Sequence, residues 1–156
     1  MLLRRALAKG GDLTDFYLNV GDEVVQERLV TGAAIDAFAD VSGDHSPNHV
    51  DDETMSKSAY GGRIAHGALL VAYMSACSTE IVERAPDARS AETPVSLGYD
   101  RIRFLKPVYV GDKILLRYTV KQVDIERRRA FSEIVIVNQR SETVCVGEHI
   151  LKWVAG

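Results

Sequence analysis

Residues 66–84 read His-Gly-Ala-Leu-Leu-Val-Ala-Tyr-Met-Ser-Ala-Cys-Ser-Thr-Glu-Ile-Val-Glu-Arg. Placed on a helix, this stretch is apolar on almost every side, and a helix of that kind must be enclosed by other parts of the protein. Its longest apolar run, residues 68–76, is far shorter than the roughly 20 residues that span a membrane. The stretch therefore predicts a buried core helix that begins near His66 and Gly67 and ends near Arg84.

The segments around this helix favour a second helix and several strands. Residues 32–41 have helical spacing of apolar side chains, with Thr31 as the expected N-cap. Alternation and β-branched residues predict strands, which are expected at residues 23–30, 95–104, 113–126, 130–140 and 143–154. Short connections between the later strands are typical of an antiparallel meander, and residues 86–90 predict a loop.

Helices early and strands late indicate the α+β class, in which a long antiparallel sheet wraps around one central buried helix. Such a sheet has open edges and leaves the helix incompletely covered. Pairing of two copies is the usual way to cover both. We therefore expect a homodimer, or a higher homo-oligomer built from dimers.

Length and charge limit the function classes. A chain of 156 residues suits a single domain over residues 1–156, with residues 1–18 as an N-terminal extension. A net charge of −3 provides no basic field for nucleic acid.

Cys77 and Cys145 form no CxxC pair and are expected to be buried thiols of a reducing compartment. With no secretory signal recognised in residues 1–9 and no membrane partner expected, a cytoplasmic location is predicted.

A short polar segment, residues 42–49, reads Ser-Gly-Asp-His-Ser-Pro-Asn-His. It follows an apolar helical pattern and places Asp44 and His49 five positions apart, with a glycine and a proline that bend the chain. A carboxylate and an imidazole in one small volume can take a proton from a water and return one to a substrate. The pair indicates an enzyme; the structural alternative is that Asp44 caps a turn and His49 bonds locally.

The start of the buried helix supplies a second feature. A helix N-terminus carries free N–H groups, and a glycine there lets a carbonyl approach without meeting a Cβ. Gly67 N–H is therefore a candidate donor to a substrate oxygen that becomes negative. The alternative is that Gly67 permits close packing of helix on sheet, and that His66 is a hydrogen-bonded structural residue.

Ser75 and a group of three histidines with Asp44 each have more than one possible role. Ser75 lies in the apolar helix, where its hydroxyl either lines a substrate pocket or bonds back to a helix carbonyl. His45, His49 and His66 with Asp44 could be imagined as metal ligands, but their spacing matches no known zinc pattern. We expect no metal.

With these residues in place, the chain resembles the R-specific enoyl-CoA hydratases, also called MaoC-like dehydratases, which have a hot-dog fold. Their motif reads approximately Ser-Gly-Asp-x-Asn-Pro-aliphatic-His, followed downstream by an Ile-x-His-Gly helix start. Residues 42–49 and 64–67 match these two parts. Residues 104–112, Phe-Leu-Lys-Pro-Val-Tyr-Val-Gly-Asp, look like the family's connection between long strands, and the resemblance covers about residues 20–154.

The resemblance implies a role for each matching residue. Asp44 and His49 would activate a water, one removing its proton and the other protonating the substrate α-carbon. Gly67 N–H would polarise the thioester carbonyl, and Ser75 matches a helix serine that lines the family's site; we also expect His66 near the substrate. The implied reaction adds water to a trans-2-enoyl-CoA to give the (3R)-3-hydroxyacyl-CoA, without a metal or redox cofactor.

The chain departs from the family motif at two positions. Ser46 stands where the family has asparagine, and Asn48 replaces the aliphatic residue before the histidine. Both are expected to lie at the substrate and to alter the choice of acyl group. Two other functions remain open: a hot-dog acyl-CoA thioesterase, and a non-catalytic subunit that binds acyl-CoA or serves in assembly.

Overall fold

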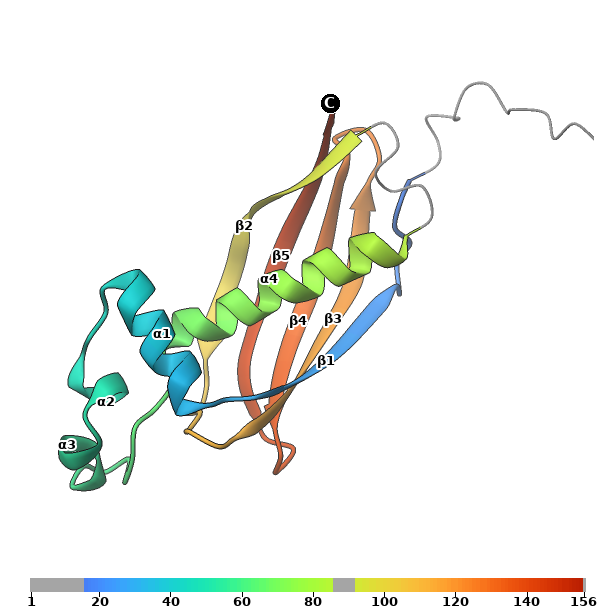
Figure 1. Ribbon diagram of the computed structural model, residues 1–156. Coiled ribbons are helices and arrows are strands. Elements are labelled where there is room, and N and C mark those ends of the chain that lie inside the picture. Colours follow the sequence, from blue (N-terminus) through green and yellow to red (C-terminus); the bar gives the residue numbers. More distant parts are fainter. Residues whose placement is uncertain (1–15, 86–91, 156) are drawn as a thin grey trace, which may run out of the picture.

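The computed structural model, described over residues 16–85 and 92–155, is a five-stranded antiparallel sheet curved around one long helix (Figure 1). Three shorter helices precede the long one and project beyond the end of the sheet (Figure 1). The elements follow the order β1 (Glu23–Leu29), α1 (Gly32–Ser42), α2 (Pro47–Val50), α3 (Asp52–Ser56), α4 (Gly67–Arg84), β2 (Glu92–Phe104), β3 (Lys113–Asp124), β4 (Arg129–Asn138) and β5 (Thr143–Ala155). The predicted α+β class, with a sheet wrapped around the helix, is confirmed.

The sheet order is β1-β3-β4-β5-β2. Strands β3, β4 and β5 form the predicted meander, but β2 does not join it beside β3. Instead β2 pairs with β5, from Glu92 opposite Ala155 to Phe104 opposite Cys145. The reason is that β1 and β4 already occupy both sides of β3, so β2 takes the free edge of β5. The connection after β2 therefore crosses from one edge of the sheet toward the other.

The core lies between α4 and the concave face of the sheet. Alternate residues of β3, β4 and β5 are buried, as the period of two in the sequence predicts. Met74 and Cys77 of α4 are fully buried. The opposite side of the helix is open, and its exposed positions include Ala68, Ala72, Ser75 and Thr79. The prediction that α4 is enclosed therefore holds only for the side that faces the sheet, because one curled sheet covers one side of a helix.

The N-terminal end of the described chain packs on the end of β5. The ring of Phe16 lies edge-on to Trp153 with centroids 4.8 Å apart, and Leu18 is buried. The Tyr17 hydroxyl donates to Glu92, which also pairs with Arg128. Residues 1–15 and the predicted loop at residues 86–90 lie outside the described residues, so the expectations for them stay predictions.

Two further expectations concern the core and membranes. Cys77 and Cys145 are buried and form no disulfide, and burial raises the pKa of both thiols to about 11. Among the described residues, no helix combines the length and apolar character needed to cross a membrane.

Candidate active site

The chain turns sharply after α1 and so brings Asp44 back toward His49. Gly43 adopts the left-handed conformation with φ 78° and donates its N–H to the carbonyl of Ala39, which ends the helix. Pro47 then starts the short helix α2, which carries His49. The predicted turn thus continues into a helical turn, and the Asp44 Oδ2 and His49 Nε2 atoms lie 4.0 Å apart.

Ser46 holds the Asp44 carboxylate. Its hydroxyl donates to Asp44 Oδ1 at 2.7 Å, and its backbone N–H donates to the same oxygen at 3.2 Å. These two bonds are the main causes that lower the pKa of Asp44 below its ordinary value, because they stabilise the charged form. The result is an ionised carboxylate whose second oxygen, Oδ2, is directed at His49.

The His49 ring is held by two neighbours. Its Nδ1 lies 2.7 Å from the carbonyl oxygen of Ile64, which can only accept, so Nδ1 carries a proton. Its Nε2 lies 3.2 Å from the Asn48 side-chain nitrogen, which can only donate. The Ile64 carbonyl and the Asn48 amide thus face the two nitrogens of the ring. His49 is buried, with 8% of its surface exposed.

His66 supports both members of the pair. Its Nε2 donates to the backbone carbonyl of Asp44 at 2.9 Å, and its ring stacks on His49 with centroids 3.8 Å apart. Phe38 of α1 lies against the ring of His66, at 4.9 Å between centroids. His66 Nδ1 is buried and has no hydrogen-bond partner among the described residues. His66 therefore fits the alternative of a hydrogen-bonded structural residue, and it also lies directly against Asp44 and His49.

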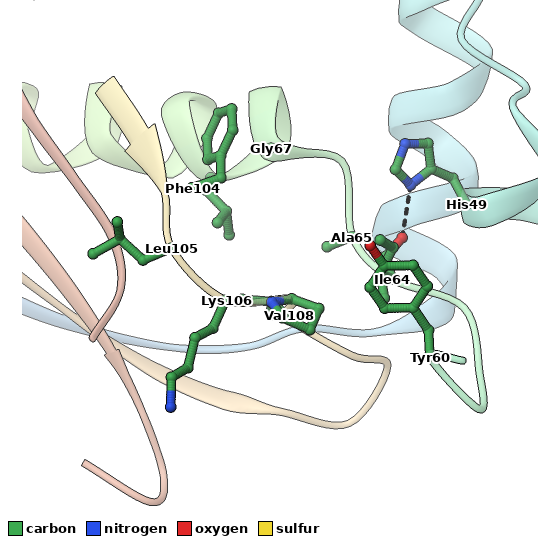
Figure 2. A pocket seen from close by; sticks show the side chains of 11 residues that line it. His49, Tyr60, Ile64, Ala65, Gly67, Phe104, Leu105, Lys106 and Val108 are labelled. Carbon is green, nitrogen blue, oxygen red and sulfur yellow. Dashed lines mark hydrogen bonds between the residues drawn. The ribbon is translucent and has the colours of Figure 1, made fainter. Parts of the chain in front are cut away.

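Gly67 opens α4 immediately after His66 and faces the ring of Phe104 at the end of β2 (Figure 2). A Cβ on Gly67 would lie 2.4 Å from the Phe104 ring, closer than such atoms ever approach. Any larger residue here would therefore require the Phe104 ring to move, while the first N–H of the helix has no partner inside the helix itself. The packing alternative for Gly67 fits this contact, and the role of its N–H as a donor to substrate stays a prediction.

A cavity of about 330 Å³ lies beside this helix start (Figure 2). Its walls come from the end of β2, the chain before α4 and the His49 ring, and they comprise His49, Tyr60, Ile64, Ala65, Gly67, Leu70, Phe104, Leu105, Lys106, Pro107 and Val108. His49 and Gly67 share this cavity, whereas Asp44 does not line it and is about half exposed. Of the 11 residues, Phe104 to Val108 belong to the motif that the sequence singled out only as a connection.

Ser75 lies apart from the pair. It is eight positions beyond Gly67, which corresponds to about 12 Å along a helix, and it lines a separate cavity of about 220 Å³ between α4 and β2. Ser78 and Ser96 line the same cavity. The structure therefore groups Asp44, Ser46, Asn48, His49, His66 and Gly67, and leaves Ser75 outside that group.

Arg63 is a part of the site that the sequence did not reveal. Its guanidinium binds Asp36 of α1 at 2.7 Å and Asp52 of α3 at 3.0 Å, and it donates to the carbonyl of His49 at 3.2 Å. The side chain is 12% exposed. These contacts join three short helices around His49. The only signal in the sequence was a lone arginine in a glycine turn, and its partners are too distant in the chain to be recognised.

Three atoms of the site could in principle approach a cation, since ligand-type atoms of Asp44, His49 and His66 lie within 4.8 Å of one another. One nitrogen of each ring, however, already donates to a backbone carbonyl. The other nitrogen of each ring and the Asp44 carboxylate can take part in proton transfer without a bound ion. The expectation that the site uses no metal stays a prediction.

The chain is similar to proteins of known name. Residues 18–144 match the family model described as MaoC like domain. Nodulation protein N of Rhizobium meliloti is 32% identical over 118 residues, which cover 74% of this chain and 71% of that protein. The 3-hydroxyacyl-thioester dehydratase Z of Mycobacterium tuberculosis is 28% identical over 151 residues, covering 92% and 96%.

A solved structure agrees with these relatives. The (R)-hydratase of A. caviae involved in PHA biosynthesis superposes with a TM-score of 0.77 at 25% identity, covering 86% of this chain and 96% of that one. The hot-dog fold expected from the sequence is confirmed. The family match spans most of the chain, including the Asp44–His49 segment and the start of α4. This chain is a member of the MaoC-like dehydratase family.

Proposed function

We propose that the protein is a hydro-lyase that adds water to a trans-2-enoyl-CoA thioester to give the (3R)-3-hydroxyacyl-CoA, or catalyses the reverse dehydration. One observation carries the proposal: Asp44 Oδ2 and His49 Nε2 lie 4.0 Å apart, and His49 lies beside the N-terminus of α4. Two proton acceptors at that separation can both contact one water. Relatives named as a dehydratase and an (R)-hydratase support the reaction class.

The chemistry balances without another reactant. The water oxygen bonds to Cβ of the enoyl group, the electrons of the double bond move toward the thioester carbonyl, and the pair takes one proton from the water. The pair then returns a proton to Cα, so that Asp44 and His49 end in their starting states. Negative charge grows on the thioester oxygen in between, and Gly67 N–H at the positive end of α4 would stabilise it. The proposal assigns no step to a metal or redox cofactor.

We propose that two copies of the chain form the working unit. The open side of α4 and the free edge of β2 are among the surfaces that a single chain leaves uncovered. A second copy placed there would close both, as an isologous dimer. Sedimentation equilibrium should give at least twice the mass of one chain, and a monomer at micromolar concentration would contradict this part of the proposal.

The reaction is tested with a panel of enoyl-CoA thioesters, beginning with crotonyl-CoA, by following loss of absorbance of the conjugated double bond. Asp44→Asn and His49→Gln should each lower the rate by at least about 100-fold, the usual contribution of a positioned acid or base. Asp40→Asn and His45→Gln make the same exchanges at neighbouring exposed positions and serve as matched controls. Chiral chromatography of the product should show the (3R) isomer.

The same assay separates the two other functions. Release of free CoA thiol without loss of the double bond would indicate a thioesterase. Binding of acyl-CoA without turnover of any thioester in the panel would indicate a non-catalytic subunit. Full activity of both Asp44→Asn and His49→Gln would remove the pair from the mechanism.

A further inference from the structure

The Asn48 side chain is the feature of the site that the proposed reaction leaves unexplained. It occupies the position before the histidine that is aliphatic in the motif the sequence resembles, yet its amide is directed at the histidine ring. The Asn48 nitrogen lies 3.2 Å from His49 Nε2, the nitrogen that must accept a proton. A polar side chain at this point contacts the reacting atom of the base directly.

The backbone holds Asn48 and His49 against the same anchor. Ile64 donates its N–H to the carbonyl of Asn48 at 3.0 Å, and Ile64 accepts from His49 Nδ1 at 2.7 Å. Pro47 starts the helical turn that carries both residues. Because two consecutive residues are tied to one partner, the amide and the ring have a defined relative position, and the contact between them follows from the fold.

We propose that Asn48 is a positioning residue that keeps His49 Nε2 unprotonated and oriented as the base; the proposal rests on the proposed function. An amide N–H can donate only to a nitrogen that has a free lone pair, so this contact stabilises the neutral ring over the imidazolium. Because Ile64 accepts from Nδ1, the Asn48 contact acts on the other nitrogen and does not compete with the Ile64 bond. Water then displaces the amide as it enters between Nε2 and Asp44 Oδ2.

Other charged and titratable groups surround His49, and their contacts do not involve the Asn48 side chain. Asp44 faces Nε2 at 4.0 Å, His66 stacks on the ring, and Arg63 binds the His49 carbonyl and is itself paired with Asp36 and Asp52. Tyr60 and Lys106 line the shared cavity, and Lys106 is paired with Glu142. None of these contacts uses the Asn48 amide, so a change at Asn48 can be assigned to the lost donor.

The contact predicts an ordered response to three side chains of similar size at position 48. Asn48→Leu removes the donor, and His49 should then bind a proton about fivefold more tightly, the effect of one neutral hydrogen bond of about 1 kcal/mol. Asn48→Asp removes the donor and adds a negative acceptor, so proton binding should be tighter still. The low-pH limb of the rate profile should therefore move to higher pH in the order Asn, Leu, Asp.

Two measurements test the proposal, and one of them needs no turnover. The protonation of His49 is followed by nitrogen-15 NMR of the ring in wild type, Asn48→Leu and Asn48→Asp; with 4 histidines in the chain, His49→Gln assigns its signals. The pH dependence of kcat/KM is measured on the same proteins. Asn19→Leu, which makes the same exchange at an exposed turn position, is the matched control and should behave as wild type.

The outcomes are distinct. A shift of both the His49 titration and the low-pH limb to higher pH in Asn48→Leu supports the proposal. A shift to lower pH would mean that the amide oxygen faces the ring and would overturn it, and so would a uniform loss of rate with an unchanged titration. If wild type turns over no enoyl-CoA, the proposed function fails, while the nitrogen-15 titration still decides whether Asn48 acts on His49.

Discussion

The rings of His49 and His66 stack with centroids 3.8 Å apart and an interplanar angle of 24°. One ring belongs to the proposed acid–base pair, and the other donates to the backbone of Asp44 at 2.9 Å. His66 therefore connects the start of α4 to both members of the pair. This side chain therefore contributes to the position of the proposed pair relative to Gly67.

The first prediction separates the two contacts of His66. His66→Phe keeps a ring between Phe38 and His49 but loses the bond to the Asp44 carbonyl. We expect kcat/KM to fall by about 10- to 100-fold, because small displacements of reacting groups are costly, with only a modest loss of stability. His66→Ala should also lower the melting temperature. Wild-type activity in His66→Phe would show that the hydrogen bond does not position Asp44.

The second prediction concerns Gly67 and Phe104. Gly67→Ala should destabilise the protein, because the new Cβ would lie 2.4 Å from the Phe104 ring. Phe104→Leu in the same chain should restore much of that stability, since the two residues are coupled. If Gly67 also leaves room for the thioester, activity will stay low in the double variant. Recovery of both properties would mean that glycine serves packing alone.

A third prediction follows from the bonds between Ser46 and Asp44. Ser46→Ala removes the hydroxyl donor that is the largest cause of the lowered pKa of Asp44, so this pKa should rise toward its ordinary value. The carboxyl carbon-13 signal of Asp44, followed against pH, measures the change. Ser56→Ala, which removes a hydroxyl from an exposed helix position, is the control. An unchanged titration of Asp44 would show that the backbone N–H of Ser46 suffices.

The fourth prediction concerns pH and folding stability. His149 is fully buried between the Tyr118 hydroxyl and Ser96, and burial lowers its pKa to about 4. Below pH 6.5 the unfolded chain binds a proton that the folded chain does not. The stabilisation is therefore complete above about pH 6.5 and is lost progressively as pH falls toward 4, by about 3 kcal/mol in all.

Urea unfolding between pH 7.5 and 4.5 measures this dependence, at pH values chosen to bracket the ordinary range of histidine. His149→Gln should be less stable at neutral pH, yet its free energy of unfolding should vary less with pH than that of wild type. His45→Gln, at an exposed histidine, should keep the wild-type slope. An equal slope in His149→Gln and wild type would show that other groups cause the acid sensitivity.

Much of the fold could be predicted from local patterns. The apolar run of residues 67–84 predicted α4 with both ends correct, and Thr31 is the N-cap of α1 as expected. The partner of β2 could not be predicted in this way. Strand periodicity shows which face of a strand is buried, but a choice between two neighbours depends on which sheet edges other strands leave free.

The candidate site likewise has parts that the sequence could predict and parts that it could not. The sequence identified Asp44, His49 and Gly67, because their residue types and spacing are tied to one turn and one helix start. It could not show that Asn48 donates to His49 Nε2 or that Arg63 joins α1 and α3 around His49. The sequence does not indicate which partner an amide or a guanidinium group will have in the folded chain.

By itself, the sequence determined α1, α4 and the strands, and it singled out the residues that we propose react, since these follow from periodicity and residue chemistry over a few neighbouring positions. Only the tertiary structure decided the order of the strands, the stack of His66 on His49, the contact of Phe104 with Gly67 and the separation of Ser75 from the pair. Each of these depends on distances between segments that are far apart in the chain, and such distances are set when the sheet closes around α4.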